Sequence, residues 1–197
     1  RKLLTQMQGA GDRLFRLISD VLDFSIIEAG RLQIEREPVC LRDTIASILR
    51  QHSKQAEAKG LDIVSNHNDL PDLSILGDEQ RIEQVLNNLV GNAVKFTING
   101  RVSIESQLQI HGDSVHFRVD VLDTGPGIDP EKQKGIFQRF SSGDSSDRRR
   151  HGGAGLGLSI ARGICQEMNA DLTLNSDPPH GSCFSFSMEL ELAHQAT

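Results

Sequence analysis

Apolar residues follow a heptad pattern over the first thirty positions, where they recur alternately four and three residues apart. This spacing predicts a long amphipathic helix that packs in a bundle. A helix that packs on its own domain would also be apolar on one side, but the strict regularity favours a dimerising or multi-helix partner. The seam consists of Leu3, Met7, Ala10, Leu14, Leu17, Val21 and Phe24, widened by Leu4, Phe15, Ile18 and Leu22.

The rest of the chain mixes helical and alternating patterns. Helices are predicted from Leu41 to about Ala58, from Glu79 to Phe96 and from Ser159 to Met168. Strands are predicted over 61–65, 73–76, 102–110, 115–122, 172–175 and 183–190. We therefore expect an α+β fold, a two-layer sandwich with helices on one face of a mixed sheet. The predicted units are 1–37, the bundle helix, and 38–197, the sandwich.

Composition narrows the function classes. The chain has 197 residues and a formal net charge of −6, which argues against generic nucleic-acid binding. No apolar run approaches the ~20 residues that span a bilayer. The three cysteines, Cys40, Cys165 and Cys183, form no paired motif and are predicted to be reduced core thiols of a cytosolic protein. The chain begins inside a helical pattern, so we expect it to be part of a longer protein.

Polar residues of the Glu79–Phe96 helix share one face opposite its apolar stripe. Gln84, Asn88 and Asn92 lie four residues apart, and Lys95 follows three residues later. Amide oxygens suit a hard cation such as Mg²⁺, and an ammonium group suits phosphate oxygens. Because helix interiors disfavour asparagine, we favour a binding function over a merely solvated face.

A glycine-rich segment, residues 152–158, precedes the last predicted helix. Its backbone N–H groups and the positive end of the helix dipole predict an anion cradle. The segment has neither the Gly-Lys-Ser/Thr ending of a P-loop nor the third glycine of a dinucleotide-binding loop, because Leu158 stands there. Phe137 and Phe140 are predicted to anchor a lid formed by residues 141–151, and Arg139 is a candidate phosphate contact.

Asp123 follows a predicted strand and begins the sequence Asp-Thr-Gly-Pro-Gly. A carboxylate at this point could accept a hydrogen bond from an adenine amine. The same Asp-Thr-Gly run also resembles the catalytic loop of aspartic proteases. Those enzymes are all-β proteins, and that interpretation would leave the asparagine-rich helix and the glycine segment unexplained.

The order of these motifs resembles the N, G1, F and G2 boxes of sensor histidine kinases, of the hybrid type, which are members of the GHKL superfamily. The segment from Leu14 to Ile34, with the run 20–30, is similar to the second helix of that family's dimerisation and phosphoacceptor domain. The resemblance implies the GHKL (Bergerat) ATP-binding fold from about residue 38. The boxes are Asn88-Leu-Val-Gly-Asn92-Ala-Val-Lys95-Phe96-Thr97, Asp123-Thr-Gly125-Pro-Gly127, Ile136-Phe137-Gln-Arg-Phe140 and Gly152-Gly-Ala-Gly155-Leu-Gly157-Leu.

The resemblance implies a role for each matching position. Asn92 would be the Mg²⁺ ligand, Asn88 and Lys95 would act on the ATP phosphates as catalytic residues, and Asp123 would read adenine. ATP-hydrolysing cousins carry a general-base glutamate where this chain has Asn88, so phosphoryl transfer to histidine is expected rather than hydrolysis. The remaining positions implied in cofactor binding are Gly125, Gly127, Ile128, Phe140, Gly153, Gly155, Leu156 and Gly157.

No histidine of this sequence stands in the family's acceptor context, and none precedes His52. The resemblance thus implies a protein-histidine kinase catalytic domain that cannot phosphorylate itself as this fragment. Its expected partners are ATP, a second kinase helix in a homodimer or hetero-pair, a phosphoacceptor domain and a response-regulator receiver domain, with no metal beyond nucleotide-bound Mg²⁺. The implied location is the cytosolic portion of a larger protein, which in this family can carry an inner-membrane anchor. The alternative is a regulatory module that pairs through its helix and binds nucleotide weakly or not at all.

Overall fold

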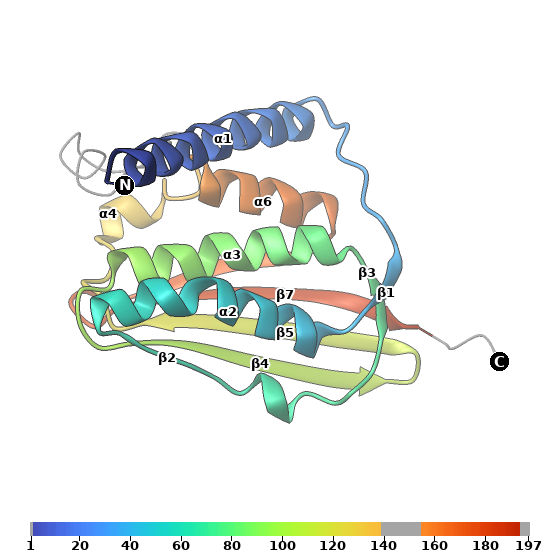
Figure 1. Ribbon diagram of the computed structural model, residues 1–197. Coiled ribbons are helices and arrows are strands. Elements are labelled where there is room, and N and C mark those ends of the chain that lie inside the picture. The colour runs from blue at the N-terminus through green and yellow to red at the C-terminus, as the bar shows by residue number, and fades with distance from the viewer. Residues whose placement is uncertain (1, 139–154, 194–197) are drawn as a thin grey trace.

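The computed structural model, which describes residues 2–138 and 155–193, is a sheet covered on one face by helices (Figure 1). This arrangement confirms the predicted α+β sandwich and excludes the all-β fold of an aspartic protease. The helices are α1 (Lys2–Glu28), α2 (Leu41–Lys59), α3 (Glu79–Phe96), α4 (Pro130–Gln133) and α6 (Gly157–Glu167), with a 3-10 turn, η1, at His67–Asp69. The strands are β1 (Glu37–Val39), β2 (Asp62–Ser65), β3 (Ile75–Gly77), β4 (Arg101–His111), β5 (Ser114–Asp123), β6 (Asp171–Ser176) and β7 (Ser182–Leu192).

The sheet is mixed and has the strand order β1-β3-β7-β5-β4-β2, with β6 paired to β7 beyond this path. β2 and β4 are parallel, whereas the other pairs are antiparallel. The β4–β5 hairpin closes with His111 opposite Ser114, so Gly112 and Asp113 connect the two strands. β5 therefore lies in the middle of the sheet, and its last residue, Asp123, lies at the same end of the sheet as Thr97, which follows α3.

The core lies between the sheet and the helix layer. Alternate residues of β5 are fully buried, and their neighbours on the other face are partly or fully exposed. Phe117 of β5 meets Phe186 of β7 edge to face, with ring centroids 6.3 Å apart. α3 supplies the apolar stripe above them, and this stripe consists of Ile82, Val85, Leu86, Leu89, Val90, Ala93 and Val94.

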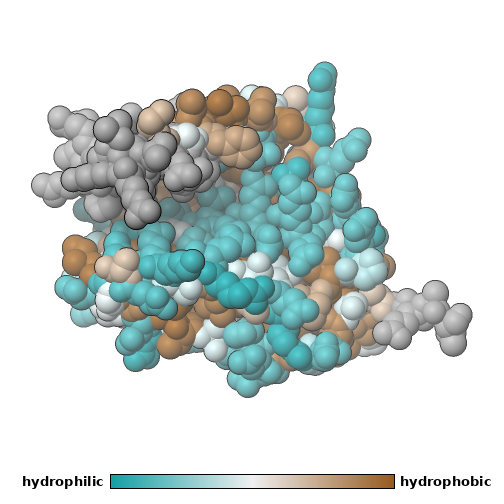
Figure 2. All heavy atoms as spheres, viewed as in Figure 1, coloured by the Kyte–Doolittle hydropathy of each residue, from teal (hydrophilic) through white to brown (hydrophobic). Residues whose placement is uncertain are grey.

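α1 lies outside the helix layer and rests on α6 (Figure 1). Phe24 and Ile27 pack against the core of the chain's own sandwich, so the end of the heptad seam does not face outward. Most of the rest is exposed and forms the brown ridge along α1 in Figure 2. Leu3, Leu4 and Ala10 have side chains outside the described part. The exposed apolar side chains are Met7, Leu14, Phe15, Leu17, Ile18, Val21, Leu22 and Ile26.

The predicted elements agree with the structure within a few residues, and three short elements were missed: β1, η1 and α4. Only Cys165 is a core thiol, because Cys40 and Cys183 are half-buried. Cys183 pairs with Leu122 on the face of the sheet that the helices do not cover. The unit boundary after residue 37 stays a prediction. Within the described residues, no helix combines the length and apolar character needed to cross a membrane.

Candidate functional site

α3 is the scaffold of the candidate site, and side chains from elsewhere hold both of its ends. At the amino end, the Asp78 carboxylate accepts the Arg81 backbone N–H and the Glu35 backbone N–H, each at 3.0 Å. At the carboxyl end, the Lys59 ammonium of α2 donates to three carbonyls at 2.7, 2.7 and 3.0 Å, those of Val94, Lys95 and Thr97. An acceptor at the first turn and a cation at the last turn both favour the helix.

One face of α3 carries a row of polar side chains, which we call the polar stripe: Arg81, Gln84, Asn88, Asn92 and Lys95. Their spacing of three or four residues keeps them in line along the helix. The structure thus has on one face the four α3 residues that the sequence singled out, and it adds Arg81 to the same row.

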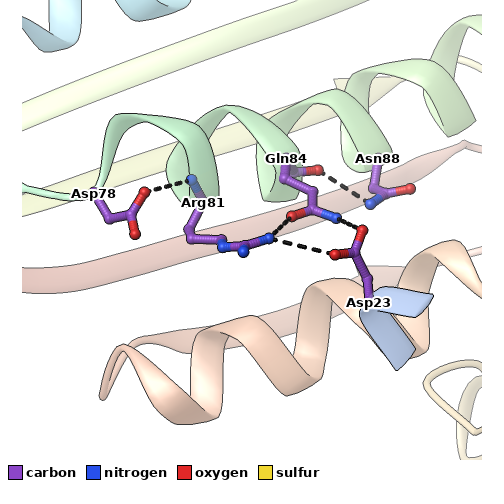
Figure 3. Close-up of polar contacts among 5 residues, drawn as sticks. All are labelled: Asp23, Asp78, Arg81, Gln84 and Asn88. Carbon is purple, nitrogen blue, oxygen red and sulfur yellow. Dashed lines mark hydrogen bonds and ion pairs between the residues drawn. The ribbon is translucent and has the colours of Figure 1, made fainter. Parts of the chain in front are cut away.

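Asp23 of α1 occupies the amino end of the stripe (Figure 3). One oxygen of its carboxylate accepts the Gln84 amide N–H at 2.8 Å, and the other lies 3.5 Å from the Arg81 guanidinium. The same guanidinium nitrogen donates to the Gln84 amide oxygen at 2.8 Å. Both charged side chains are largely buried, so each compensates the other.

Asn88 is held in one orientation. Its amide N–H donates to the Gln84 backbone carbonyl at 3.0 Å, which leaves the amide oxygen pointing away from the helix (Figure 3). This oxygen faces Gly157, the first residue of α6. A Cβ at Gly157 would lie 2.5 Å from the Asn88 oxygen, so only glycine leaves the amide in this position.

Asn92 and Lys95 continue the stripe toward its carboxyl end. Asn92 is half-buried, and its side chain makes no hydrogen bond to any residue that the structure describes. The Lys95 ammonium lies 4.8 Å from the centroid of the Phe96 ring. Burial lowers the pKa of Lys95, because the charged form loses hydration. The Asn92 amide and the Lys95 ammonium therefore have hydrogen-bonding groups that no described residue engages.

Asp123 ends β5 on the side of the sheet that faces the helices, in register with Val102 of β4. Its carboxylate accepts the Gly125 backbone N–H at 2.8 Å. Burial raises the pKa of Asp123, and the N–H groups of Gly125 and Ser182 partly offset the rise. A Cβ at Gly125 would come within 2.6 Å of the carboxylate and 3.5 Å of the Thr97 hydroxyl, so this turn abuts the carboxyl end of α3.

The remaining predicted site residues that the structure describes lie in the segments after β5 and before α6. Gly127 has a left-handed backbone (φ +70°), and the Ile128 N–H donates to the Ser176 hydroxyl at 2.9 Å. Gly155 and the buried Leu156 lead directly into α6. Phe140 and Gly153 lie outside the described residues, as do Arg139 and the predicted lid.

Sequence reasoning missed several partners. Asn87 directly precedes Asn88 in the sequence, but its amide oxygen lies 3.0 Å from the His52 imidazole of α2, on another face of α3. Burial lowers the pKa of His52. Lys59 and Asp23 also went unrecognised, because their partners are far away in the sequence. No cluster of three potential His, Cys, Asp or Glu metal ligands occurs within residues 2–138 and 155–193.

The site therefore extends along α3, from Asp123 and Gly125 at the level of Thr97 to Gly157 at the level of Asn88. A family model described as "Histidine kinase-, DNA gyrase B-, and HSP90-like ATPase" matches residues 77–192, which include all of these positions. The chain belongs to this ATPase family. Within the family, it is homologous to the catalytic domain of sensor histidine kinases, as the following relatives demonstrate.

The signal transduction histidine-protein kinase BarA of Escherichia coli (strain K12) is 39% identical over 194 residues, which are 98% of this chain and 21% of BarA. The sensor histidine kinase GacS of Pseudomonas protegens is 39% identical over 189 residues, covering 95% of this chain and 20% of GacS. A crystal structure of full-length ShkA in complex with AMPPNP superposes with a TM-score of 0.77 at 33% identity, covering 100% of this chain and 40% of ShkA. The chain thus spans about a fifth of the two curated relatives.

Proposed function

We propose that this chain binds ATP with Mg²⁺ and presents the γ-phosphate to a histidine of a phosphoacceptor domain. One observation carries the proposal: the half-buried Asn92 amide has no described partner and stands between the outward Asn88 oxygen and the Lys95 ammonium. A polar group that is partly desolvated and unpaired in the middle of a helix face is suited to a ligand.

The described residues fit such a nucleotide at both of its ends. At one end, Gly157 lets the Asn88 amide oxygen lie against the first residue of α6, and helix amino ends favour anions such as phosphate groups. At the other end, the ionised Asp123 carboxylate can accept the adenine amine. Its raised pKa reflects burial, which also provides the low-polarity surroundings that make a hydrogen bond to a base selective.

In this arrangement, the Asn92 oxygen would ligate Mg²⁺, which neutralises charge on the phosphates when bound. Asn88 and Lys95 would hold phosphate oxygens and orient the terminal group. Asn88 cannot remove a proton from water, because an amide is not a base at neutral pH. The site would therefore favour an acceptor that brings its own nucleophile, such as an imidazole, over hydrolysis.

The exposed apolar ridge of α1 supports a bundle partner, either a second copy of this chain or the helix of another kinase. The same proposal includes a response-regulator receiver domain as the partner that accepts the phosphoryl group next, and a cytosolic location for this chain. BarA and GacS are named as signal transduction and sensor kinases, and similarity to them supports a phosphorelay role for this chain.

Titration with Mg·AMPPNP tests the proposal. We expect saturable binding that Asp123→Asn abolishes, because an amide presents its donor or its single acceptor to adenine less favourably than a carboxylate. Asp62→Asn is the matched control, since it removes the same charge from the exposed side of β2 and should leave affinity unchanged. Absence of binding by the unaltered chain would instead favour the regulatory-module alternative.

A labelling experiment tests the acceptor. Incubation with γ-labelled ATP should leave no acid-labile label on this chain alone, because no histidine in its sequence has an acceptor context. Addition of a separate histidine phosphoacceptor domain from a relative should produce acid-labile label on that domain. Acid-labile label on the chain itself would contradict the prediction.

A further inference from the structure

The Asp23 contact lies directly beyond the phosphate end of the proposed nucleotide site. If adenine is read at the level of Thr97 and the metal is held at Asn92, the phosphates run toward the amino end of α3. The next groups on the polar stripe beyond Asn88 are Gln84, one helical turn or about 6 Å away, and Arg81, two turns or about 10.5 Å away. A terminal phosphate held at Asn88 would therefore be close enough for the extended Arg81 side chain to reach it.

Arg81 is already paired, but with a group that belongs to a separate element. Its ion pair with Asp23 is 3.5 Å long, whereas its bond to Gln84 on the same helix is 2.8 Å. The long contact comes from α1, which joins the sandwich through the segment 29–36. The guanidinium could exchange this carboxylate for another anion while it keeps its bond to Gln84.

The packing of α1 on the sandwich is incomplete. Ile27 reaches α6 only because Gly163 has no side chain; a Cβ there would lie 2.6 Å from an Ile27 methyl group. Beside this contact, a cavity of about 490 Å³ opens between the two helices, lined in part by Phe24, Phe137 and Arg162. Ile27 and Asp23 are thus two of the contacts that hold this helix, and the cavity beside them leaves part of its surface unpacked.

We propose that α1 docking and the anionic nucleotide compete for Arg81, so that a bound triphosphate takes this cation from Asp23 and loosens α1. This inference rests on the proposed function and adds Arg81 to the nucleotide-contacting residues. Because coupling is reciprocal, the docked Asp23 lowers the affinity for a triphosphate to the same extent that the triphosphate weakens docking. α1 thereby senses the nucleotide state.

Affinities for Mg·AMPPNP and for AMP, which lacks the terminal phosphates, test the proposal in the full chain. Asp23→Asn should tighten Mg·AMPPNP binding about three- to tenfold, the effect of one charge at this range in a partly solvated site, and should change AMP binding less than about twofold. Arg81→Gln should weaken Mg·AMPPNP binding selectively. In the Arg81→Gln background, the effect of Asp23→Asn should shrink, which a double-mutant cycle measures.

Two further variants separate competition from simple charge removal. Glu191→Gln removes one carboxylate from an exposed ion pair with Arg36 and should leave both affinities unchanged. Ile27→Ala weakens docking without altering any charge, and it should tighten Mg·AMPPNP binding about twofold or more, because the docked state no longer withholds Arg81.

Hydrogen exchange provides the structural readout. Amides of residues 20–28 should exchange faster with Mg·AMPPNP than without it, and AMP should have no such effect. Unchanged or weaker Mg·AMPPNP binding by Asp23→Asn, or slower exchange of α1 with Mg·AMPPNP, would overturn the inference. If the unaltered chain binds Mg·AMPPNP and either of these two overturning results is obtained, only the inference fails. If the unaltered chain binds no adenine nucleotide, the proposed function fails as well.

Discussion

The two ends of the polar stripe on α3 have similar side chains but differ in their hydrogen bonding to the rest of the protein. In the amino half, the Arg81 and Gln84 side chains bond to each other and to Asp23. In the carboxyl half, Asn92 has no hydrogen-bond partner among the described residues, and Lys95 contacts only an aromatic ring there. Residue type and helix position therefore do not distinguish a structural polar group from a ligand-binding one. The presence or absence of a partner does, and Arg81 would contact the nucleotide only by giving up its pairing with Asp23.

Among changes to the polar stripe and its ends, Asn92→Ala should produce the largest effect and should leave the fold intact. Loss of a ligand to a charged group costs about 1.5–3 kcal/mol, so Mg·AMPPNP affinity should fall about 10- to 100-fold in calorimetric titration. Asn87→Ala is the matched control on the same helix, because its amide contacts His52 instead. Asn87→Ala should lower the free energy of unfolding and leave the affinity for Mg·AMPPNP unchanged. An equal loss of affinity in Asn87→Ala and Asn92→Ala would show that the two faces of α3 do not differ in this respect.

Asp78→Ala tests the structural half. The change removes the amino cap of α3 and leaves the Glu35 N–H without its acceptor, so the free energy of unfolding should fall by about 2 kcal/mol in urea denaturation. Asp78→Asn should retain most of the stability, since asparagine also caps helices well. Affinity for Mg·AMPPNP should remain within about twofold in the folded protein. A larger loss would mean that the two halves are not separable.

Gly157→Ala should disturb the ligand half from the side of α6. The added methyl group collides with the Asn88 oxygen and turns the amide away, so affinity should fall about tenfold, the effect of one lost hydrogen bond. Gly135→Ala is the control, because a Cβ there has its nearest neighbour at 3.7 Å, an ordinary contact distance. Unchanged affinity in Gly157→Ala would show that the Asn88 orientation is unimportant.

The smallest effect concerns the ionisation of Asp123. Its pKa is raised in the folded state, so the ionised carboxylate costs stability above that pKa, and this cost disappears as the pH falls. Asp123→Asn should therefore be at least as stable as the unaltered chain at pH 7, with the difference vanishing near pH 4. Denaturant titrations at the two pH values measure it. Nucleotide affinity of the unaltered chain should decrease as the pH falls through the raised pKa, and an unvarying affinity would contradict the role of the carboxylate.

The elements that could be predicted from sequence are those whose own periodicity determines them. α3 was predicted with its observed bounds, because its apolar stripe and its polar face each repeat over the whole helix. β1 was missed because a strand of three residues, two of them exposed, has no pattern to read. α4 is a single turn and gives no helical period.

Asn88, Asn92 and Lys95 share one side of α3, as their spacing predicts, but the partners of the neighbouring polar residues could not be predicted. Asn87, Asn88 and Asn92 look alike in the sequence, and only tertiary contacts separate them. The heptad seam of α1 was also ambiguous at its end, since Phe24 fits the bundle pattern and yet packs on the chain's own sandwich. Contacts between residues far apart in the chain leave no local signal.

Lys59 has a consequence for chemical labelling. Its ammonium group has three N–H donors, and the carbonyls of Val94, Lys95 and Thr97 take all of them. Acylation of this amine must first break one of these bonds, although the residue lies at the surface. The rate at which an amine-reactive reagent modifies Lys59, compared with Lys54 on the same helix, therefore reports how often Lys59 leaves the last turn of α3, beside the proposed adenine end of the site.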